Sequence, residues 1–268
     1  MKVIVITGAS DGIGAELARQ WAQRDGGGAA LVLGARGLDK LQAVAAQCEA
    51  LGAQVLALRC DVEQQHDCST LIDAAVARFG RLDVLVNNAG ISAHAMLDEV
   101  DDLAWYERLM RINFWGSVWT THAALPHLKA SHGRLVAVSS LAGLIGIPGR
   151  TAYSSSKFAM GGFFEALRGE LAADGVSVTV AFPGVVDTQI RYRGLNARGE
   201  PLGRSAMDER GAMTVQTCAR LILEGCLARR REIVMTAKGR LGRWLKLLAP
   251  GLVDRMALAA MKKDERPR

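Results

Sequence analysis

The amino-acid sequence predicts a single α/β domain in which a doubly wound parallel sheet of about seven strands carries helices on both faces. Short apolar runs alternate with longer amphipathic runs along most of the chain. Strands that alternate with helices in this way form a parallel sheet with right-handed crossovers. The 268 residues, of which half are hydrophobic and 22% are charged, are enough for the core of one large globular domain.

The expected strands are short apolar runs, as is typical of buried parallel strands. In chain order they cover residues 3–6, 31–33, 55–59, 82–86, 135–138, 176–182 and 232–236. The expected helices have apolar residues at helical spacing, and they cover residues 16–24, 38–51, 71–79, 103–128, 158–171 and 215–229. Residues 189–213 are polar, contain glycine and show no period. A loop of that length in a compact domain is typical of a lid over a functional site.

A glycine-rich turn, residues 7–14, connects the first expected strand to the first expected helix. Gly8 and Gly12 allow backbone conformations and close approaches that a Cβ would block, and Gly14 lets the helix pack on the strand. The free N–H groups of the helix N-terminus face the turn and attract an anion. The turn therefore predicts a phosphate cradle, whose candidate cofactor contacts are Gly8, Ser10, Gly12, Ile13 and Gly14.

Charged residues at the ends of the second and third strands indicate which nucleotide the cradle prefers. In NAD-selective sites an acid at the end of the second strand accepts a hydrogen bond from the ribose 2′-OH, whereas an Arg nearby accommodates a 2′-phosphate. The acid is missing here and Arg36 is present, so the sequence favours NADP over NAD. Alternatively, Arg36 is a solvated loop cation. Asp61 could accept from an adenine amino group or cap the helix that begins near Gln64.

Asparagines occur at two further positions. The turn at residues 87–90, Asn-Asn-Ala-Gly, follows the fourth strand, and its small residues and amides could approach a ribose or only tie strands together. Asn113 lies among apolar residues of the long helical stretch. A buried Asn must satisfy its amide, so we expect Asn113 to hold a water or a bent backbone.

Tyr153 and Lys157 are four residues apart at the start of a helical run, so they lie on one face, one turn apart. A nearby ammonium favours the phenolate, so Lys157 would allow Tyr153 to give and take protons near neutral pH. A lone Tyr-x-x-x-Lys pair is common on helices, so the pair indicates catalysis only together with the other motifs.

These motifs resemble those of the classical short-chain dehydrogenase/reductase family over about residues 1–236. They stand in the family's order: the glycine turn, Asp61, Asn87-Asn88-Ala89-Gly90, Asn113, Ser140, Tyr153-x-x-x-Lys157 and Pro183-Gly184. The resemblance implies a Rossmann-type fold and hydride transfer between a carbonyl or alcohol and a nicotinamide cofactor, with Tyr153 as general acid or base. It also implies that Lys157 binds the nicotinamide ribose, that Ser140 hydrogen-bonds the substrate oxygen and that Asn113 holds a water in the proton relay.

The resemblance also implies how the cofactor would lie. Asp61 would meet the adenine, and Thr188 the carboxamide of the nicotinamide. Arg36 matches a position of NADP-preferring members, but Ser10-Asp11 stands where many NADP users have a basic residue. The other expected cofactor contacts are Val62, Asn88, Ala89, Gly90, Pro183 and Gly184.

The substrate pocket is expected to be apolar. Its candidate walls are residues 91–94 and 141–147, Val185, Val186 and the lid, so we predict a hydrophobic ketone or secondary alcohol as substrate. The resemblance implies a homodimer or homotetramer. A rival hypothesis is a catalytically silent NAD(P)-binding sensor or scaffold, which would keep the cradle but would not need Ser140, Tyr153 and Lys157 together.

Composition argues against several other functions. The five cysteines form no C-x-x-C and the five histidines have no metal spacing, so we expect no metal site and a reducing, cytoplasmic location. The net charge is +6, but residues 229–268 hold 12 Lys/Arg against 4 Asp/Glu, so the rest is near neutral. Nucleic-acid motifs are absent, and we expect no nucleic-acid partner. Met1-Lys2 leads directly into a strand, so neither a signal peptide nor a spanning helix is expected.

Residues 237–268 are expected to form a basic amphipathic extension beyond the 1–236 domain. One helical face carries Leu241, Trp244, Leu245 and Leu248, while Arg240, Arg243 and Lys246 lie elsewhere around the helix. Pro250-Gly251 interrupts this run, and residues 252–261 form a second apolar helix. The pair could pack on the substrate side or on a partner subunit, or it could contact anionic lipid.

Overall fold

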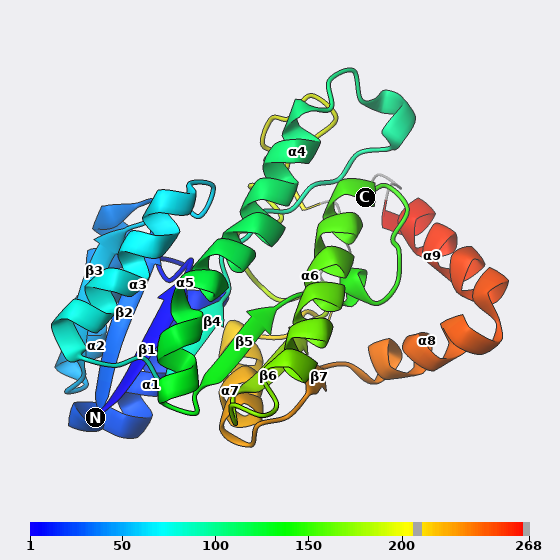
Figure 1. The fold of residues 1–268 in the computed structure, drawn as a ribbon. Helices are drawn as coiled ribbons and strands as arrows, with labels where there is room; N and C mark the ends of the chain where they lie inside the picture. Colours follow the sequence, from blue (N-terminus) through cyan, green and yellow to red (C-terminus); the bar gives the residue numbers. More distant parts are fainter. Residues whose placement is uncertain (206–210, 265–268) are drawn as a thin grey trace.

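A parallel sheet forms the centre of the computed structural model, which describes residues 1–205 and 211–264 (Figure 1). Within these residues the sheet has seven strands in the order β3-β2-β1-β4-β5-β6-β7, and every neighbouring pair is parallel. The strands are β1 (Lys2–Thr7), β2 (Ala29–Ala35), β3 (Gln54–Arg59), β4 (Val84–Asn87), β5 (Arg134–Val138), β6 (Ser177–Phe182) and β7 (Glu232–Val234). The predicted doubly wound fold is confirmed, and every strand end lies within two residues of its expected position.

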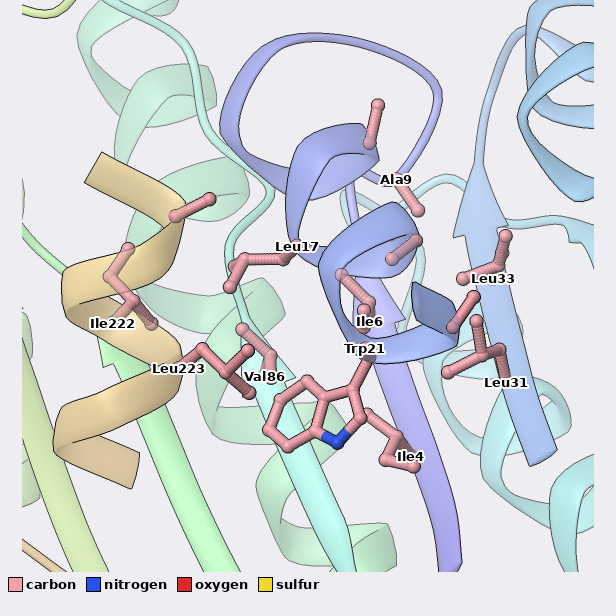
Figure 2. Close-up of a cluster of buried hydrophobic side chains, with 14 of the residues drawn as sticks. Ile4, Ile6, Ala9, Leu17, Trp21, Leu31, Leu33, Val86, Ile222 and Leu223 are labelled. Atoms are coloured by element: carbon pink, nitrogen blue, oxygen red, sulfur yellow. The ribbon is translucent and has the colours of Figure 1, made fainter. Parts of the chain in front are cut away.

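Helices cover both faces of the sheet. The α-helices of the described residues are α1 (Gly12–Asp25), α2 (Leu38–Ala50), α3 (Gln65–Phe79), α4 (Ala104–Met110), α5 (Gly116–Ala130), α6 (Thr151–Glu170), α7 (Val215–Leu227), α8 (Ala237–Leu248) and α9 (Pro250–Asp264). Alternate residues of β1 point to opposite faces, as a strand requires. Ile4 and Ile6 pack with Leu17 and Trp21 of α1 and with Ile222 of α7 (Figure 2). On the other face, the cluster around Val3 and Val5 includes side chains of α3, α5 and α6.

The long helix expected over residues 103–128 is divided. A π-helical turn, Arg111–Trp115, separates α4 from α5 and contains Asn113. The Asn113 Oδ1 accepts from Ile91 N at 2.8 Å, and its Nδ2 donates to Ile91 O and to the Ser156 hydroxyl. A π-turn interrupts the regular pattern of α-helical hydrogen bonds, so the irregular backbone expected at Asn113 is present. Its amide is satisfied by the loop after β4 and by α6.

The helix that carries Tyr153 and Lys157, α6, begins seven residues earlier than expected, at Thr151 and not at residue 158. Residues 154–156 are all serine, and serine hydroxyls compete for backbone groups and weaken an isolated helix. Here the competition is resolved locally. The Ser156 hydroxyl donates to Tyr153 O, and the Ser154 N–H donates to Arg150 O. Tyr153 and Lys157 therefore both lie on the first two turns of α6.

Two regions were expected near the substrate side: the predicted lid, residues 189–213, and the C-terminal extension, residues 237–268. Residues 189–205 of the predicted lid dock on the loop after β4, where Leu195 N donates to Ser92 O and His94 N donates to Leu195 O. Residues 206–210 of that lid lie outside the described residues. Beyond β7, α8 and α9 lie at the edge of the molecule past α6 (Figure 1). The helices in the described part of the chain include none that is long and apolar enough to cross a membrane.

Candidate active site

A cleft of about 610 Å³ opens at the carboxyl ends of the strands, where open α/β sheets bind their ligands. Predicted residues from the glycine turn, from the ends of five strands and from α6 all line it. They are Gly8, Ser10, Gly12, Ile13, Arg36, Asp61, Val62, Asn88, Ala89, Gly90, Ser140, Tyr153, Lys157, Pro183, Gly184 and Thr188. Gly14 and Asn113 were also predicted, but they lie behind the lining. The chain thus brings separate motifs into one site.

The glycine turn has the conformation that its residues predict. Gly8 has φ +66° and Gly12 has φ +52°, in the region that favours glycine. A Cβ on Gly8 would lie 2.8 Å from the Ala89 Cα. The expectation for Gly14 needs a correction, because a Cβ there would lie 2.4 Å from Gly8 O and from the Asn88 amide nitrogen. Gly14 therefore lets α1 approach the glycine turn at Gly8 and the asparagine turn at Asn88, and not the strand β1.

The asparagine turn holds β1 and β4 together at the floor of the cleft. The Asn88 amide nitrogen donates to Thr7 O at 2.9 Å and to Gly8 O at 3.1 Å. In return, Asn88 N and Ala89 N donate to the Thr7 hydroxyl, each at 3.1 Å. Of the two roles considered for this turn, the one that connects neighbouring strands is present. The approach of a ribose to the turn stays a prediction.

At the end of the cleft beside β2 and β3, cations outnumber acids. Arg36 and Lys40 line the cleft here together with Asp61. The Asp61 Oδ1 accepts from Glu63 N at 3.2 Å, and Glu63 lies before α3. Because Asp61 does not bond an N–H group of α3 itself, its alternative role as the cap of that helix is wrong. Lys40 was not predicted. Its place in the first turn of α2, four residues after Arg36, is the signal that could have identified it.

Lys157 is buried beside the phenol of Tyr153. Its Nζ donates to Val138 O at 3.0 Å, lies 3.4 Å from the Met160 sulfur, and lies 5.8 Å from the centre of the Tyr153 ring. Burial lowers the pKa of Lys157 to about 8. The fold therefore holds this amine close to its titration point at neutral pH.

A second cation, Arg150, was missed at the sequence level. Its guanidinium carbon lies 4.3 Å from the centre of the Tyr153 ring, a distance typical of a cation–π contact. Arg150 also donates to the Ser92 hydroxyl at 2.6 Å and to Ala93 O at 3.3 Å. The only sequence signal was an arginine three residues before the tyrosine, just ahead of α6.

Two adjacent serines at the end of β5 have different surroundings. Ser140 lines the cleft, and its hydroxyl oxygen accepts from Ala142 N at 3.2 Å. Ser139 is buried, and its hydroxyl donates to Lys157 O at 3.2 Å. Ser140 is thus placed where a substrate oxygen could meet it, whereas Ser139 ties β5 to α6.

A cleft above a glycine turn at the carboxyl ends of parallel strands, lined by a tyrosine, a lysine and a serine, is the arrangement expected of a nucleotide-dependent oxidoreductase. The sequence model of the short chain dehydrogenase family matches residues 2–197, so the chain belongs to that family. The protein is accordingly an NAD(P)-dependent dehydrogenase that acts on CH–OH groups.

Relatives of known name and solved structures agree with this assignment. The chain is 39% identical over 259 residues to 11-beta-hydroxysteroid dehydrogenase A of Sesamum indicum. This alignment covers 94% of this chain and 73% of the Sesamum protein. The chain is 38% identical to 11-beta-hydroxysteroid dehydrogenase-like 4A of Arabidopsis thaliana, covering 94% and 82%. A short chain dehydrogenase/reductase from Burkholderia phymatum in complex with NAD superposes with a TM-score of 0.80 at 26% identity, covering 94% of both chains. An alcohol dehydrogenase from Thermococcus sibiricus complexed with 5-hydroxy-NADP gives 0.74 at 28% identity, covering 87% and 94%.

Proposed function

We propose that the protein interconverts a hydrophobic ketone and its secondary alcohol with NADP, using Tyr153 as the proton-transfer group. The observation that supports this is the convergence of Tyr153, Lys157 and Ser140 in one cleft. The bound nicotinamide supplies or accepts the hydride. The Tyr153 hydroxyl protonates the carbonyl oxygen in reduction and takes the proton back in oxidation. The Lys157 ammonium binds the nicotinamide ribose, and the Ser140 hydroxyl holds the substrate oxygen.

The residues of the cleft fit a dinucleotide. Gly8 and Gly12 carry no side chain into the cradle next to the N-terminus of α1, where backbone N–H groups attract phosphate. Arg36 and Lys40 would receive the 2′-phosphate, and Asp61 with Val62 would flank the adenine. Thr188, Pro183 and Gly184 would border the nicotinamide. We propose that Asn113 supports the proton relay from behind Gly90, because its Oδ1 is the nearest atom to a Cβ built there, at 3.0 Å.

The substrate class rests on the walls of the cleft and on the relatives. The apolar residues Ile91, Leu141, Ile147, Val185 and Val186 line the same cleft as Tyr153. The similar plant proteins are named as hydroxysteroid dehydrogenases. We expect NADPH consumption with cyclic and steroid-like ketones and none with small sugars. Turnover confined to small polar sugars would contradict the hydrophobic class.

The cofactor preference is testable at Arg36. We expect the wild-type protein to bind NADPH at least about tenfold more tightly than NADH, which is about 1.4 kcal/mol. Arg36→Ala should remove this margin, because the 2′-phosphate loses its cation. The measurement is calorimetric titration with both nucleotides. Arg59→Ala, an exposed arginine at the end of β3 outside the cleft lining, is the matched control and should keep the margin.

The rival proposal, a silent nucleotide-binding sensor, predicts nucleotide binding without turnover of any carbonyl compound. It does not require the three catalytic side chains, and their joint presence in the cleft argues against it. We further propose a homodimer or homotetramer, as the family resemblance implies, and a cytoplasmic location. Five free and buried cysteines support a reducing compartment.

For residues 237–268 we propose a separate amphipathic extension that contacts anionic lipid. In α8, Leu241, Trp244, Leu247 and Leu248 are exposed, whereas Leu245, expected on the same face, is half-buried. The exposed Lys238 and Arg240 of α8 complement an anionic surface, whereas Arg243 pairs with Glu232 and Lys246 donates to Leu144 O. Deletion from Lys238 onwards should abolish sedimentation with phosphatidylserine vesicles, and neutral phosphatidylcholine vesicles are the control. Unchanged sedimentation after the deletion would remove the lipid proposal.

A further inference from the structure

An acidic residue occupies the phosphate cradle. Asp11 directly precedes α1, and its Oδ1 accepts from Gly12 N at 2.7 Å. The carboxylate is therefore already bound at the helix N-terminus, which is the place that attracts a phosphate. Two anions held a few ångströms apart repel each other. The 2′-phosphate, which is the additional charge of NADP, therefore needs a compensating cation near Asp11.

The lid supplies that cation. The Arg193 Nη2 lies 2.7 Å from the Asp11 Oδ2, although the two residues are 182 positions apart in the chain. Partial burial raises the pKa of the Asp11 carboxyl, but the hydrogen bonds from Arg193 and Gly12 and the charges of Arg193 and Lys40 lower it further, so the net shift is downward. Asp11 thus carries its negative charge inside a group of cations.

Arg193 is held in place by the lid and not only by its charge. The Arg193 N–H donates to Gln189 O, and Gly203 N donates to the carbonyl of its neighbour Tyr192. The same segment is fixed to the loop after β4 through Leu195 and Ser92. The fold therefore presents Arg193 to the cradle as a built feature.

Stability alone does not explain this ion pair. The side chains of Arg193 and Asp11 are 54% and 40% exposed, and such pairs contribute only about 0–1 kcal/mol. Both side chains line the cleft, as do Arg36 and Lys40. Ala9 N donates to Gly34 O at 3.2 Å, so the glycine turn that carries Asp11 lies against the end of β2, where a 2′-phosphate would lie.

We propose that Arg193 is a specificity-determining residue that neutralises Asp11, so that a glycine turn carrying an acid accepts the 2′-phosphate of NADP. This inference rests on the proposed NADP function. It explains why an aspartate can stand in the turn where many NADP users of the family have a basic residue. It also couples the lid to cofactor binding, because the neutralising group belongs to the lid.

The test uses calorimetric titration of four full-length variants with NADPH and NADH. Arg193→Gln exposes the charge of Asp11, and we expect about tenfold weaker NADPH binding with NADH changed less than about twofold. Asp11→Asn keeps the helix cap and removes the charge. The double variant Asp11→Asn/Arg193→Gln should therefore bind NADPH within about threefold of wild type. Arg198→Gln, in the same lid but outside the cleft lining, is the control and should bind both nucleotides normally.

Three results would overturn the inference: an unchanged NADPH affinity in Arg193→Gln, an equal loss for both nucleotides, or a double variant that binds no better than Arg193→Gln. Failure of the underlying function has a different signature. A wild-type protein that binds NADPH and NADH equally would remove the NADP proposal, and this inference with it, before any variant is compared.

Discussion

Tyr153→Phe should lower kcat for carbonyl reduction by about 10²- to 10⁴-fold, the range that general acid–base groups contribute. The affinity for NADPH should change little, because phenylalanine keeps the ring that contacts Arg150 at 4.3 Å. Steady-state turnover and nucleotide titration separate the two effects. Tyr106→Phe is the matched control, since the Tyr106 hydroxyl bonds the Thr151 hydroxyl at 2.6 Å and Tyr106 does not line the cleft. Full turnover by Tyr153→Phe would show that another group transfers the proton.

The pH profile gives a second readout of the same site. The pKa of Lys157 is lowered from 10.5 to about 8 by burial, so the amine is charged below about pH 8 and neutral above it. The charged ammonium is the form that we propose binds the nicotinamide ribose and supports proton transfer by Tyr153. We therefore expect kcat/KM for alcohol oxidation to fall as the pH rises through about 8. Lys157→Arg, which stays charged, should remove that high-pH limb.

Burial of the Lys157 ammonium also opposes folding. The pKa of Lys157 is lower in the folded protein than in the unfolded chain, so the unfolded chain binds more protons between pH 8 and 10.5. Stability should rise with pH across that window, and the cost of the charged amine is present below it. A group kept at such a cost close to the phenol is typical of a functional site.

The fold and the motif positions could be predicted because each depends on local pattern. Every strand is an apolar run that is recognisable without its neighbours, and Tyr153 and Lys157 are related by one turn of α6. The start of α6 was missed, because three consecutive serines have a low intrinsic preference for helix. Contacts made after folding, such as the bond between Ser156 and Asn113, favour that turn. The break at residues 111–115 has the same origin, since the Asn113 amide is satisfied by Ile91 from a distant loop.

The cations of the cleft show more clearly which contacts could not be predicted from the sequence. Arg36 was predictable, because a rule connects the end of the second strand with the ribose of the cofactor. Arg150 contacts Tyr153 from three residues away, a spacing that becomes informative only when α6 is known to begin at Thr151. The contacts of Arg193 with Asp11, in contrast, depend on the packing of a distant loop, and no spacing in the sequence encodes them. Predicting them would have required knowing how the lid returns across the glycine turn.

Gly14→Ala should damage the cradle and the stability of the protein together. An ideal Cβ on Gly14 would lie 2.4 Å from Gly8 O and from the Asn88 amide nitrogen, closer than real Cβ contacts. Either atom can move only if the bonds from Asn88 to Thr7 and Gly8 lengthen. Overpacking of this kind costs about 1–3 kcal/mol. We expect a lower Tm and weaker NADPH binding.

Gly162→Ala in α6 is the matched control, because a Cβ there would meet no atom within 4 Å. Alanine is about 1 kcal/mol better than glycine in a helix interior, so this variant should raise Tm slightly and leave NADPH binding unchanged. The comparison separates the loss of a glycine from the loss of the contact between the two turns. A Gly14→Ala protein with wild-type Tm and NADPH affinity would show that the turns can separate freely. In that case the rigid junction of β1, α1 and β4 would not be what positions the phosphate.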